Sequence, residues 1–257
     1  ETILELIKLS EPDYSENTLF IFPEGVLSNI YLQDLKNFSY IFSDNFSDQH
    51  KIILGISSLE NSKIFNSMVL LDKDVNILAK YDKNKLVPFG EFLPFENLLT
   101  SFGLKKITQG YQSFSSDNER KVINFSNFSF LPLICYEIIY SGKLSKDKKF
   151  DYIINISEDG WFGNSIGPKQ HFVHSIFRSI ESGKYTIRSA NNGITAVVNP
   201  IGVVEKKVDL GSRGYIDFTE GKSTKTTPFL RYGNKIFLLL ILLYIFFIFS
   251  FNRFKNE

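Results

Sequence analysis

The sequence predicts an α/β or α+β fold with buried sheets, and two patterns along its 257 residues support this. Short apolar runs that stop at turn residues are typical of buried strands. Segments with helical spacing of apolar residues lie between these runs. Strands and helices that alternate in this way favour a layered arrangement of sheets covered by helices. A chain of this length buries a large core without a disulfide or a metal to support it.

The expected elements follow from the same patterns in chain order. The opening segment ETILELIKLSE has the periodicity of an amphipathic helix. Strands are predicted over residues 18–22, 51–56, 66–71, 76–81, 122–125, 128–135, 152–156, 194–198 and 203–207, and helices over residues 32–42 and 170–190. Turn residues at 72–74 and 200–202 indicate that the strands on either side of them form hairpins.

The C-terminal region differs in composition from the rest of the chain. Residues 236–251, IFLLLILLYIFFIFSF, carry no charge and are apolar on all sides. At about 1.5 Å per residue the run gives about 24 Å of helix, against a hydrocarbon core of about 30 Å. Apolar residues from 229 onward can extend it, so we predict a transmembrane helix over residues 235–252, with a hydrophobic core helix as the alternative. Residues 219–234, which begin with the polar stretch TEGKSTKTTP, are predicted to be a tether.

Composition excludes several classes of protein. The chain has 29 Lys and Arg against 28 Asp and Glu, which argues against a strongly basic nucleic-acid binder. A single cysteine, Cys135, excludes an intramolecular disulfide framework and a Cys-rich metal site. His171 and His174 have helical spacing but no evident third ligand, so no metal is expected, and we expect them to support the cysteine loop or the helix start. The sequence also has no glycine-rich phosphate loop and no dinucleotide fingerprint, so no cofactor is expected.

Three polar residues stand where apolar strands are predicted to end: Glu24, Lys83 and Cys135. A carboxylate that takes the thiol proton and a cation that stabilises an oxyanion are what acyl-transfer chemistry on cysteine requires. Each residue also has a simpler interpretation, as a turn glutamate, a solvated lysine and a small buried cysteine. Their surroundings decide between these interpretations.

Three segments resemble the Glu–Lys–Cys sites of the nitrilase superfamily: FPEG at residues 22–25, YDKNKLVPFGE at 81–91 and CYE at 135–137. Within this superfamily the chain is most similar to the apolipoprotein N-acyltransferases. The segments LVPFGEFLPF, NISEDGWFG, PKQH and RSANNG carry this narrower resemblance, which extends over residues 10–251. It implies a nitrilase-like α-β-β-α sandwich over residues 1–218, lacking the family's first strand. It also implies that the chain is the catalytic and C-terminal part of a longer membrane enzyme.

The resemblance assigns roles to individual residues. It makes Glu24 the general base, Lys83 the oxyanion stabiliser and Cys135 the nucleophile. Glu91 matches a second glutamate that assists or orients the site. The residues expected to shape the substrate pocket are Tyr136, Glu137 and Trp161. Two positions depart from the family pattern, because Glu158 stands where an Asn is more usual and Lys85 where a His is frequent.

The resemblance further implies a two-step reaction without a cofactor. Cys135 would take an acyl chain from a phospholipid as a thioester, and the N-terminal α-amine of a diacylglyceryl-cysteine lipoprotein would then accept it. The expected location is the bacterial inner membrane, with the catalytic domain on the periplasmic side. Part of residues 92–104 is expected to be a lid that touches lipid, with core packing as the alternative. The competing functions are a nitrilase-family amidase or hydrolase acting on a small C–N substrate, and an inactive membrane-tethered binding module.

Overall fold

The computed structural model describes residues 2–27, 30–95, 101, 113–142, 144, 149–219, 221 and 224–255, and for 252–255 the backbone only. Its first half forms a four-stranded sheet in the order β1-β2-β3-β4. The strands are β1 (Leu19–Ile21), β2 (Lys51–Glu60), β3 (Lys63–Leu71) and β4 (Ile77–Asp82). β1 is parallel to β2, whereas β2, β3 and β4 form an antiparallel meander. The predicted hairpin around residues 72–74 is therefore confirmed.

The second half forms a six-stranded sheet in the order β10-β9-β8-β7-β6-β5. Its strands are β5 (Ile123–Phe125), β6 (Phe128–Ile134), β7 (Tyr152–Glu158), β8 (Tyr185–Asn191), β9 (Thr195–Val198) and β10 (Val204–Val208). The three central strands β6, β7 and β8 are parallel, and antiparallel pairs flank them on both sides. The carboxyl ends of the parallel strands meet at one edge, where ligand sites of such sheets are usually found.

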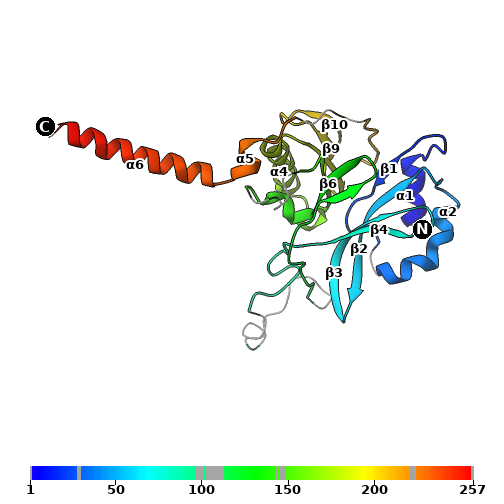
Figure 1. Ribbon diagram of the computed structural model, residues 1–257. Coiled ribbons are helices and arrows are strands. Elements are labelled where there is room, and N and C mark those ends of the chain that lie inside the picture. The colour runs from blue at the N-terminus through cyan, green and yellow to red at the C-terminus, as the bar shows by residue number, and fades with distance from the viewer. Residues whose placement is uncertain are drawn as a thin grey trace.

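The two sheets pack face to face, and helices cover their outer faces (Figure 1). Alternation along β2 shows this, since successive side chains of a strand point to opposite faces. Ile53 packs in a core cluster with Ile154 and Ile156 of β7. Its neighbours Ile52 and Leu54 pack instead in a cluster with residues of the outer helices. The result is the α-β-β-α sandwich that the sequence predicted.

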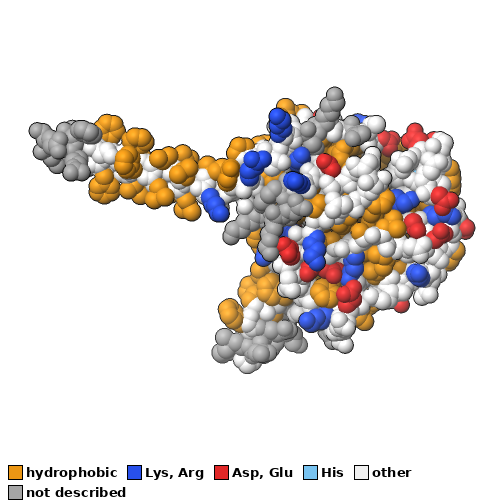
Figure 2. All heavy atoms as spheres, in the orientation of Figure 1, with side chains coloured by type: hydrophobic (Ala, Val, Ile, Leu, Met, Phe, Trp, Pro, Cys, Tyr) orange, Lys and Arg blue, Asp and Glu red, His pale blue; other side chains and the backbone are white. Residues whose placement is uncertain are grey.

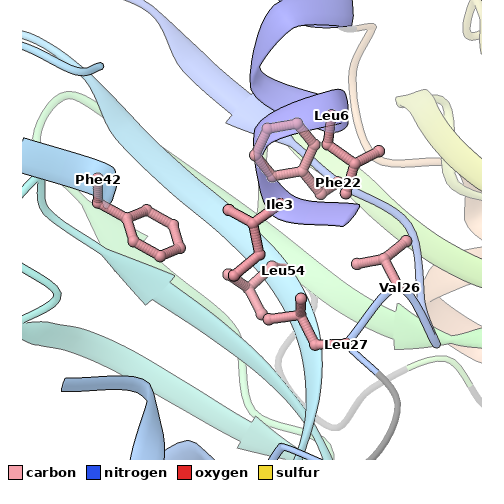
Figure 3. Close-up of a pocket in the computed structure, with 7 residues that line it drawn as sticks. All are labelled: Ile3, Leu6, Phe22, Val26, Leu27, Phe42 and Leu54. Atoms are coloured by element: carbon pink, nitrogen blue, oxygen red, sulfur yellow. The ribbon is translucent and has the colours of Figure 1, made fainter. Parts of the chain in front are cut away.

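Helices cover the outer face of each sheet. α1 (Thr2–Ser10), η1 (Leu32–Phe38) and α2 (Ser39–Ser43) cover the first sheet. α4 (Gly167–Ser182) covers the second sheet, and α5 (Pro228–Tyr232), which lies within the predicted tether, buries Leu230 against the same layer. A cavity of about 10 Å³ lies under α1 (Figure 3). Its lining residues are Ile3, Leu6, Phe22, Val26, Leu27, Phe42 and Leu54. It is entirely apolar and no larger than about one water, so it is a packing gap in the core.

The predicted helix over residues 170–190 is wrong in its second half. α4 ends at Ser182, and residues Tyr185–Asn191 form β8, a central strand of the second sheet. Gly183 ends the helix because it adopts the left-handed conformation, with φ at 69°. The β-forming residues Tyr185, Thr186 and Ile187 follow immediately.

The C-terminal apolar run forms helix α6 (Lys235–Lys255), which extends away from the sandwich (Figure 1). The predicted transmembrane helix is not found: among the described residues, none of the helices combines the length and the apolar character that crossing a membrane requires. The uncharged run is short for this purpose, as its 16 residues give about 24 Å against about 30 Å. Hydrophobic side chains along α6 are exposed (Figure 2), among them Phe237 and Leu242, each 64% exposed.

Candidate active site

The structure places the three predicted catalytic residues just after strand ends, and all three are buried. Glu24 follows β1, Lys83 follows β4, and Cys135 follows β6 of the other sheet. Their exposed fractions are 8%, 1% and 8%. Gly55 in β2 makes room for this arrangement, because a Cβ at that position would stand 2.8 Å from the Cα of Glu24. No local pattern in the sequence signals this requirement.

Two carboxylates and one amide surround the Lys83 ammonium. Its Nζ donates a hydrogen bond to Glu91 Oε1 at 2.8 Å and lies 3.6 Å from Glu24 Oε1. Asn66 in β3 bridges the two carboxylates, since its Nδ2 donates to Glu24 at 2.7 Å and to Glu91 at 2.9 Å. The second oxygen of Glu91 accepts the backbone N–H of Val87. Sequence reasoning missed Asn66, which has no motif of its own within its strand.

These contacts determine the charge of Lys83. Burial by itself lowers the pKa of Lys83, but the carboxylates of Glu24 and Glu91 raise it, and the net result lies well above the usual value. The lysine therefore remains an ammonium at any physiological pH. A fixed buried cation of this kind is suited to stabilising an oxyanion.

Cys135 is held as a thiol in a strained turn. Its φ is 48°, a left-handed conformation that side chains with a Cβ rarely adopt. Burial, and then the nearby charge of Glu24, raise the pKa of Cys135 to about 12, whereas Lys83 acts in the opposite direction. The cysteine needs a base to become a nucleophile, and the Glu24 carboxylate is near enough to influence its ionisation.

Glu24 is oriented from the other sheet. The backbone N–H of Glu158, the last residue of β7, donates to Glu24 Oε2 at 2.9 Å. The carbonyl of the same residue lies 3.9 Å from Cys135 Sγ. Its side chain accepts hydrogen bonds from Gly160 N–H and from the amides of Asn191 and Asn192. The Glu158 carboxylate, which stands where an Asn was expected, therefore has hydrogen-bond donors at this edge of the sheet.

Glu137 connects the loop that carries Lys83 to the turn that carries Cys135. Its side chain is fully buried and accepts several hydrogen bonds. The donors are Tyr81 Oη, Arg120 Nε and the backbone N–H groups of Asn84, Lys85 and Ile134. Glu137 therefore holds these two segments together.

The other predicted pocket residues lie nearer the surface. Tyr136 is half-buried and makes an edge contact with Tyr140. Trp161 follows β7 in η3 (Gly160–Phe162) and is 70% exposed. Of the expected lid, Leu93 is buried and Phe95 is 82% exposed. The residues on which the lid prediction depends, Leu98, Leu99 and Phe102, lie outside the described residues.

A buried ionic cluster lies behind Cys135, and sequence reasoning identified only part of it. Asp159, His171 and Arg188 come from the end of β7, α4 and β8, and all three are buried. Arg188 Nη2 lies 2.7 Å from Asp159 Oδ2, and His171 Nδ1 lies 2.8 Å from Asp159 Oδ1. His171 Nε2 also lies 3.2 Å from the carbonyl oxygen of Cys135, so the expected support of the Cys135 loop by His171 has a structural basis. The described residues contain no group of three or more side chains arranged to hold a metal.

Comparison with known proteins places this geometry in context. The profile of the carbon-nitrogen hydrolase family matches residues 44–219. An apolipoprotein N-acyltransferase of Bradyrhizobium diazoefficiens is 38% identical over 67% of this chain, and one of Rickettsia prowazekii is 41% identical over 70%. One of Agrobacterium fabrum is 32% identical over 93% of this chain. The matched parts make up 33%, 36% and 47% of these relatives, so the chain spans less than half of their length.

Solved structures support the fold. Nit3 of Saccharomyces cerevisiae, a member of the nitrilase superfamily, aligns with a TM-score of 0.58 at 18% identity, over 81% of this chain and 79% of its own. An amidase from Nesterenkonia sp. AN1 aligns with a TM-score of 0.55 at 14% identity, over 81% and 78%. At these identities the likeness concerns the fold alone, which is that of a nitrilase-like sandwich.

Proposed function

Since the chain belongs to the carbon-nitrogen hydrolase family, we propose that it carries the catalytic site of an acyltransferase that works through a thioester on Cys135. The acyl donor is a phospholipid, and the acceptor is the N-terminal α-amine of a diacylglyceryl-cysteine lipoprotein. The observation that carries this proposal is the buried group of Glu24, Lys83 and Glu91, whose charges act on the single cysteine.

The first step forms the thioester. Glu24 takes the thiol proton of Cys135 as the sulfur attacks the ester carbonyl of the donor, and Lys83 stabilises the resulting oxyanion. When the tetrahedral intermediate collapses, the C–O bond breaks and Glu24 returns the proton to the departing lysophospholipid alcohol. The hydrogen bonds of Glu91 and Asn66 hold the Glu24 carboxylate and the Lys83 ammonium in position.

The second step transfers the acyl group. The neutral α-amine of the acceptor attacks the thioester carbonyl, and an amide bond forms as the C–S bond breaks. Glu24 takes a proton from the amine and returns it to the sulfur, which restores the resting thiol. A resting thiol is what the raised pKa of Cys135 favours, with a value of about 12.

The relatives support acyl transfer over amide hydrolysis by the names they carry, with identities of 32–41% among those above. An amidase that acts on a small C–N substrate would share the thioester step and differ in its acceptor, which would be water. Both substrates of the proposed reaction carry long acyl chains, and moving them into water costs about 0.8 kcal/mol per CH₂. We therefore place the reaction at the periplasmic surface of the inner membrane.

Intact-mass spectrometry tests the proposal. The chain is incubated with phospholipid vesicles, and we expect an adduct of one acyl chain that is absent in Cys135→Ser. Addition of a diacylglyceryl-cysteine peptide should discharge the adduct and yield an acylated peptide. Discharge to free fatty acid at the same rate with and without the peptide would favour the hydrolase. The same experiment is made with a protein extended to the full length of its relatives. If neither protein forms an adduct, the proposal is wrong.

A further inference from the structure

Two of the three histidines are buried, and their hydrogen-bond partners define different protonation states. The backbone N–H of Ser47 donates to His50 Nδ1 at 3.1 Å, so this nitrogen is an acceptor. His50 Nε2 lies 2.8 Å from the carbonyl oxygen of Asp13, which can only accept. His50 therefore carries one ring proton, on Nε2, and is neutral.

His171 has an acceptor at each ring nitrogen. Its Nδ1 lies 2.8 Å from the carboxylate oxygen Oδ1 of Asp159. Its Nε2 lies 3.2 Å from the backbone carbonyl oxygen of Cys135. A carbonyl oxygen cannot donate, and an ionised carboxylate cannot donate either. Both nitrogens satisfy these contacts only if both carry protons.

The surroundings of Asp159 keep it ionised. Burial raises the pKa of Asp159, but the hydrogen bonds from His171 and Ser157 and the charge of Arg188 outweigh burial, so the net pKa lies below the usual value. Ser157 Oγ donates to the same oxygen that faces His171, and Arg188 Nη2 lies within 3.0 Å of both oxygens.

One competing arrangement can be set aside. Arg188 Nη2 also lies 3.3 Å from His171 Nδ1, and a bare Nδ1 would accept a hydrogen bond from the guanidinium. Its lone pair would then face the Asp159 carboxylate at 2.8 Å, which is repulsive. Protons on both His171 and Arg188 instead converge on the Asp159 carboxylate, and the 3.3 Å separation follows from that.

We propose that His171 is a buried imidazolium whose Nε2–H holds the backbone carbonyl of Cys135 and so fixes the left-handed turn that presents the sulfur. His171 is a positioning residue, since it acts through the backbone of Cys135. The assignment rests on the proposed function only in taking Cys135 as the nucleophile. This assignment puts a cation in contact with the backbone of Cys135.

The protonation of His171 depends on charged groups from several elements. Asp159 at the end of β7 favours the imidazolium, and Arg188 of β8 opposes it. His174 lies on the same helix as His171, and burial, then the charges of Arg178 and His171, lower the pKa of His174. Cys135 of η2 (Cys135–Ile139) contributes its carbonyl dipole. The contact of His171 with the Asp159 carboxylate, at 2.8 Å, is shorter than its contacts with the Cys135 carbonyl and with Arg188. We therefore assign the cationic form of His171.

Nitrogen-15 NMR of the labelled full chain tests the protonation state directly. His171→Gln and His174→Gln assign the three ring-nitrogen pairs. We expect both nitrogens of His171 to be protonated between pH 6 and pH 8, whereas His50 in the same spectrum shows one protonated and one bare nitrogen. A bare nitrogen on His171 over this range would overturn the proposal, whatever the enzyme's activity.

Kinetics test the positioning role. His171→Ala removes the hydrogen bond and the charge, and we expect thioester formation to slow about a hundredfold with the half-saturating donor concentration changed less than twofold. His171→Gln can still donate to the Cys135 carbonyl, so it should form the thioester at least tenfold faster than His171→Ala. His174→Gln, one turn along α4, is the matched control and should keep the wild-type rate.

The two proposals fail in different ways. A wild-type rate in His171→Ala, or a glutamine variant no faster than the alanine variant, would overturn the positioning role. If the alanine variant does not fold, the glutamine variant and the NMR spectrum still decide the matter. Absence of any thioester in the wild type would count against the proposed function, while the NMR result would stand alone.

Discussion

Lys83 lies between two carboxylates at the centre of the candidate site, so its replacement tests the charge balance there. In Lys83→Met, Glu24 and Glu91 lose the buried cation that faces both of them. We expect thioester formation to fall roughly 10²–10³-fold, because the oxyanion loses its stabilising charge. We also expect stability to fall by about 3–5 kcal/mol, because a buried charge cluster is left unbalanced.

Urea unfolding and single-turnover mass spectrometry measure the two effects of Lys83→Met. Lys85→Met is the matched control, since Lys85 is exposed and two residues away. Equal behaviour of the two variants would show that the position of the Lys83 charge is unimportant.

Glu24 acts on Cys135 in two opposing ways, and one substitution separates them. Its charge raises the pKa of Cys135, so Glu24→Gln should lower that pKa from about 12. The pH profile of iodoacetamide alkylation, which follows the thiolate, should then move to lower pH. Acyl transfer should instead drop at least a hundredfold, because the base is gone.

Alkylation rates between pH 7 and pH 11, read by mass spectrometry, check the Glu24 prediction. The exposed Glu16→Gln is the control and should leave the profile unchanged. An alkylation profile that moves to higher pH in Glu24→Gln would contradict the electrostatic role assigned to this carboxylate.

Sequence alone pointed to the polar residues that the structure brings together, and it missed several residues that support them. Glu24, Lys83 and Cys135 follow apolar runs, and a polar residue at a strand end stands out in a sequence. Asn66 does not stand out, because it lies inside β3 and not at a strand end. Gly55 acts through a contact between strands, and nothing local marks it.

At the scale of elements, the boundary between α4 and β8 shows how a single glycine ends a helix. A Cβ at Gly183 would stand 2.5 Å from Thr224 Oγ1 and 2.9 Å from the carbonyl of Lys225. Its φ of 69° also disfavours any other residue. The sequence pattern predicts a helix that continues to residue 190 because a lone glycine is a weak stop signal.

Gly183→Ala should therefore destabilise the protein by more than backbone strain alone. We expect a loss of about 2–4 kcal/mol, of which roughly 1–2 kcal/mol is the cost of a left-handed alanine. Gly211→Ala isolates the strain, because Gly211 has φ at 80° and an added Cβ there would meet nothing within 4 Å. Urea unfolding of both variants gives the difference. If Gly211→Ala is as destabilising as Gly183→Ala, contact with residues 224–225 contributes nothing.

At the scale of the whole molecule, the site belongs to neither sheet alone. Glu24, Lys83 and Glu91 come from the first half of the chain, and Cys135 comes from the second. The core cluster that joins Ile53, Met68 and Tyr81 to Ile134 and Ile156 holds the two halves together next to the nucleophile. The apolar runs predicted most of the strands, but the pairing of the two faces follows from packing, which a single sequence does not display.

Helix α6 extends away from the sandwich (Figure 1). Its side chains from Phe237 to Phe249 are each at least 37% exposed, and a continuous apolar surface of that size is not stable in water without a partner. We expect the full chain to bind phosphatidylcholine vesicles and a chain ending at Lys235 to lose that binding, because the apolar area that drives it has been removed.

The shortened chain should nevertheless melt within about 2 °C of the full chain, since α6 contributes no residue to any of the core clusters among the described residues. Vesicle flotation measures the binding, and thermal unfolding in detergent measures the fold. Retained flotation of the shortened chain would assign lipid binding to another surface. A melting temperature lowered by 10 °C or more would show instead that α6 packs on the sandwich, and its apolar surface would then be part of the core.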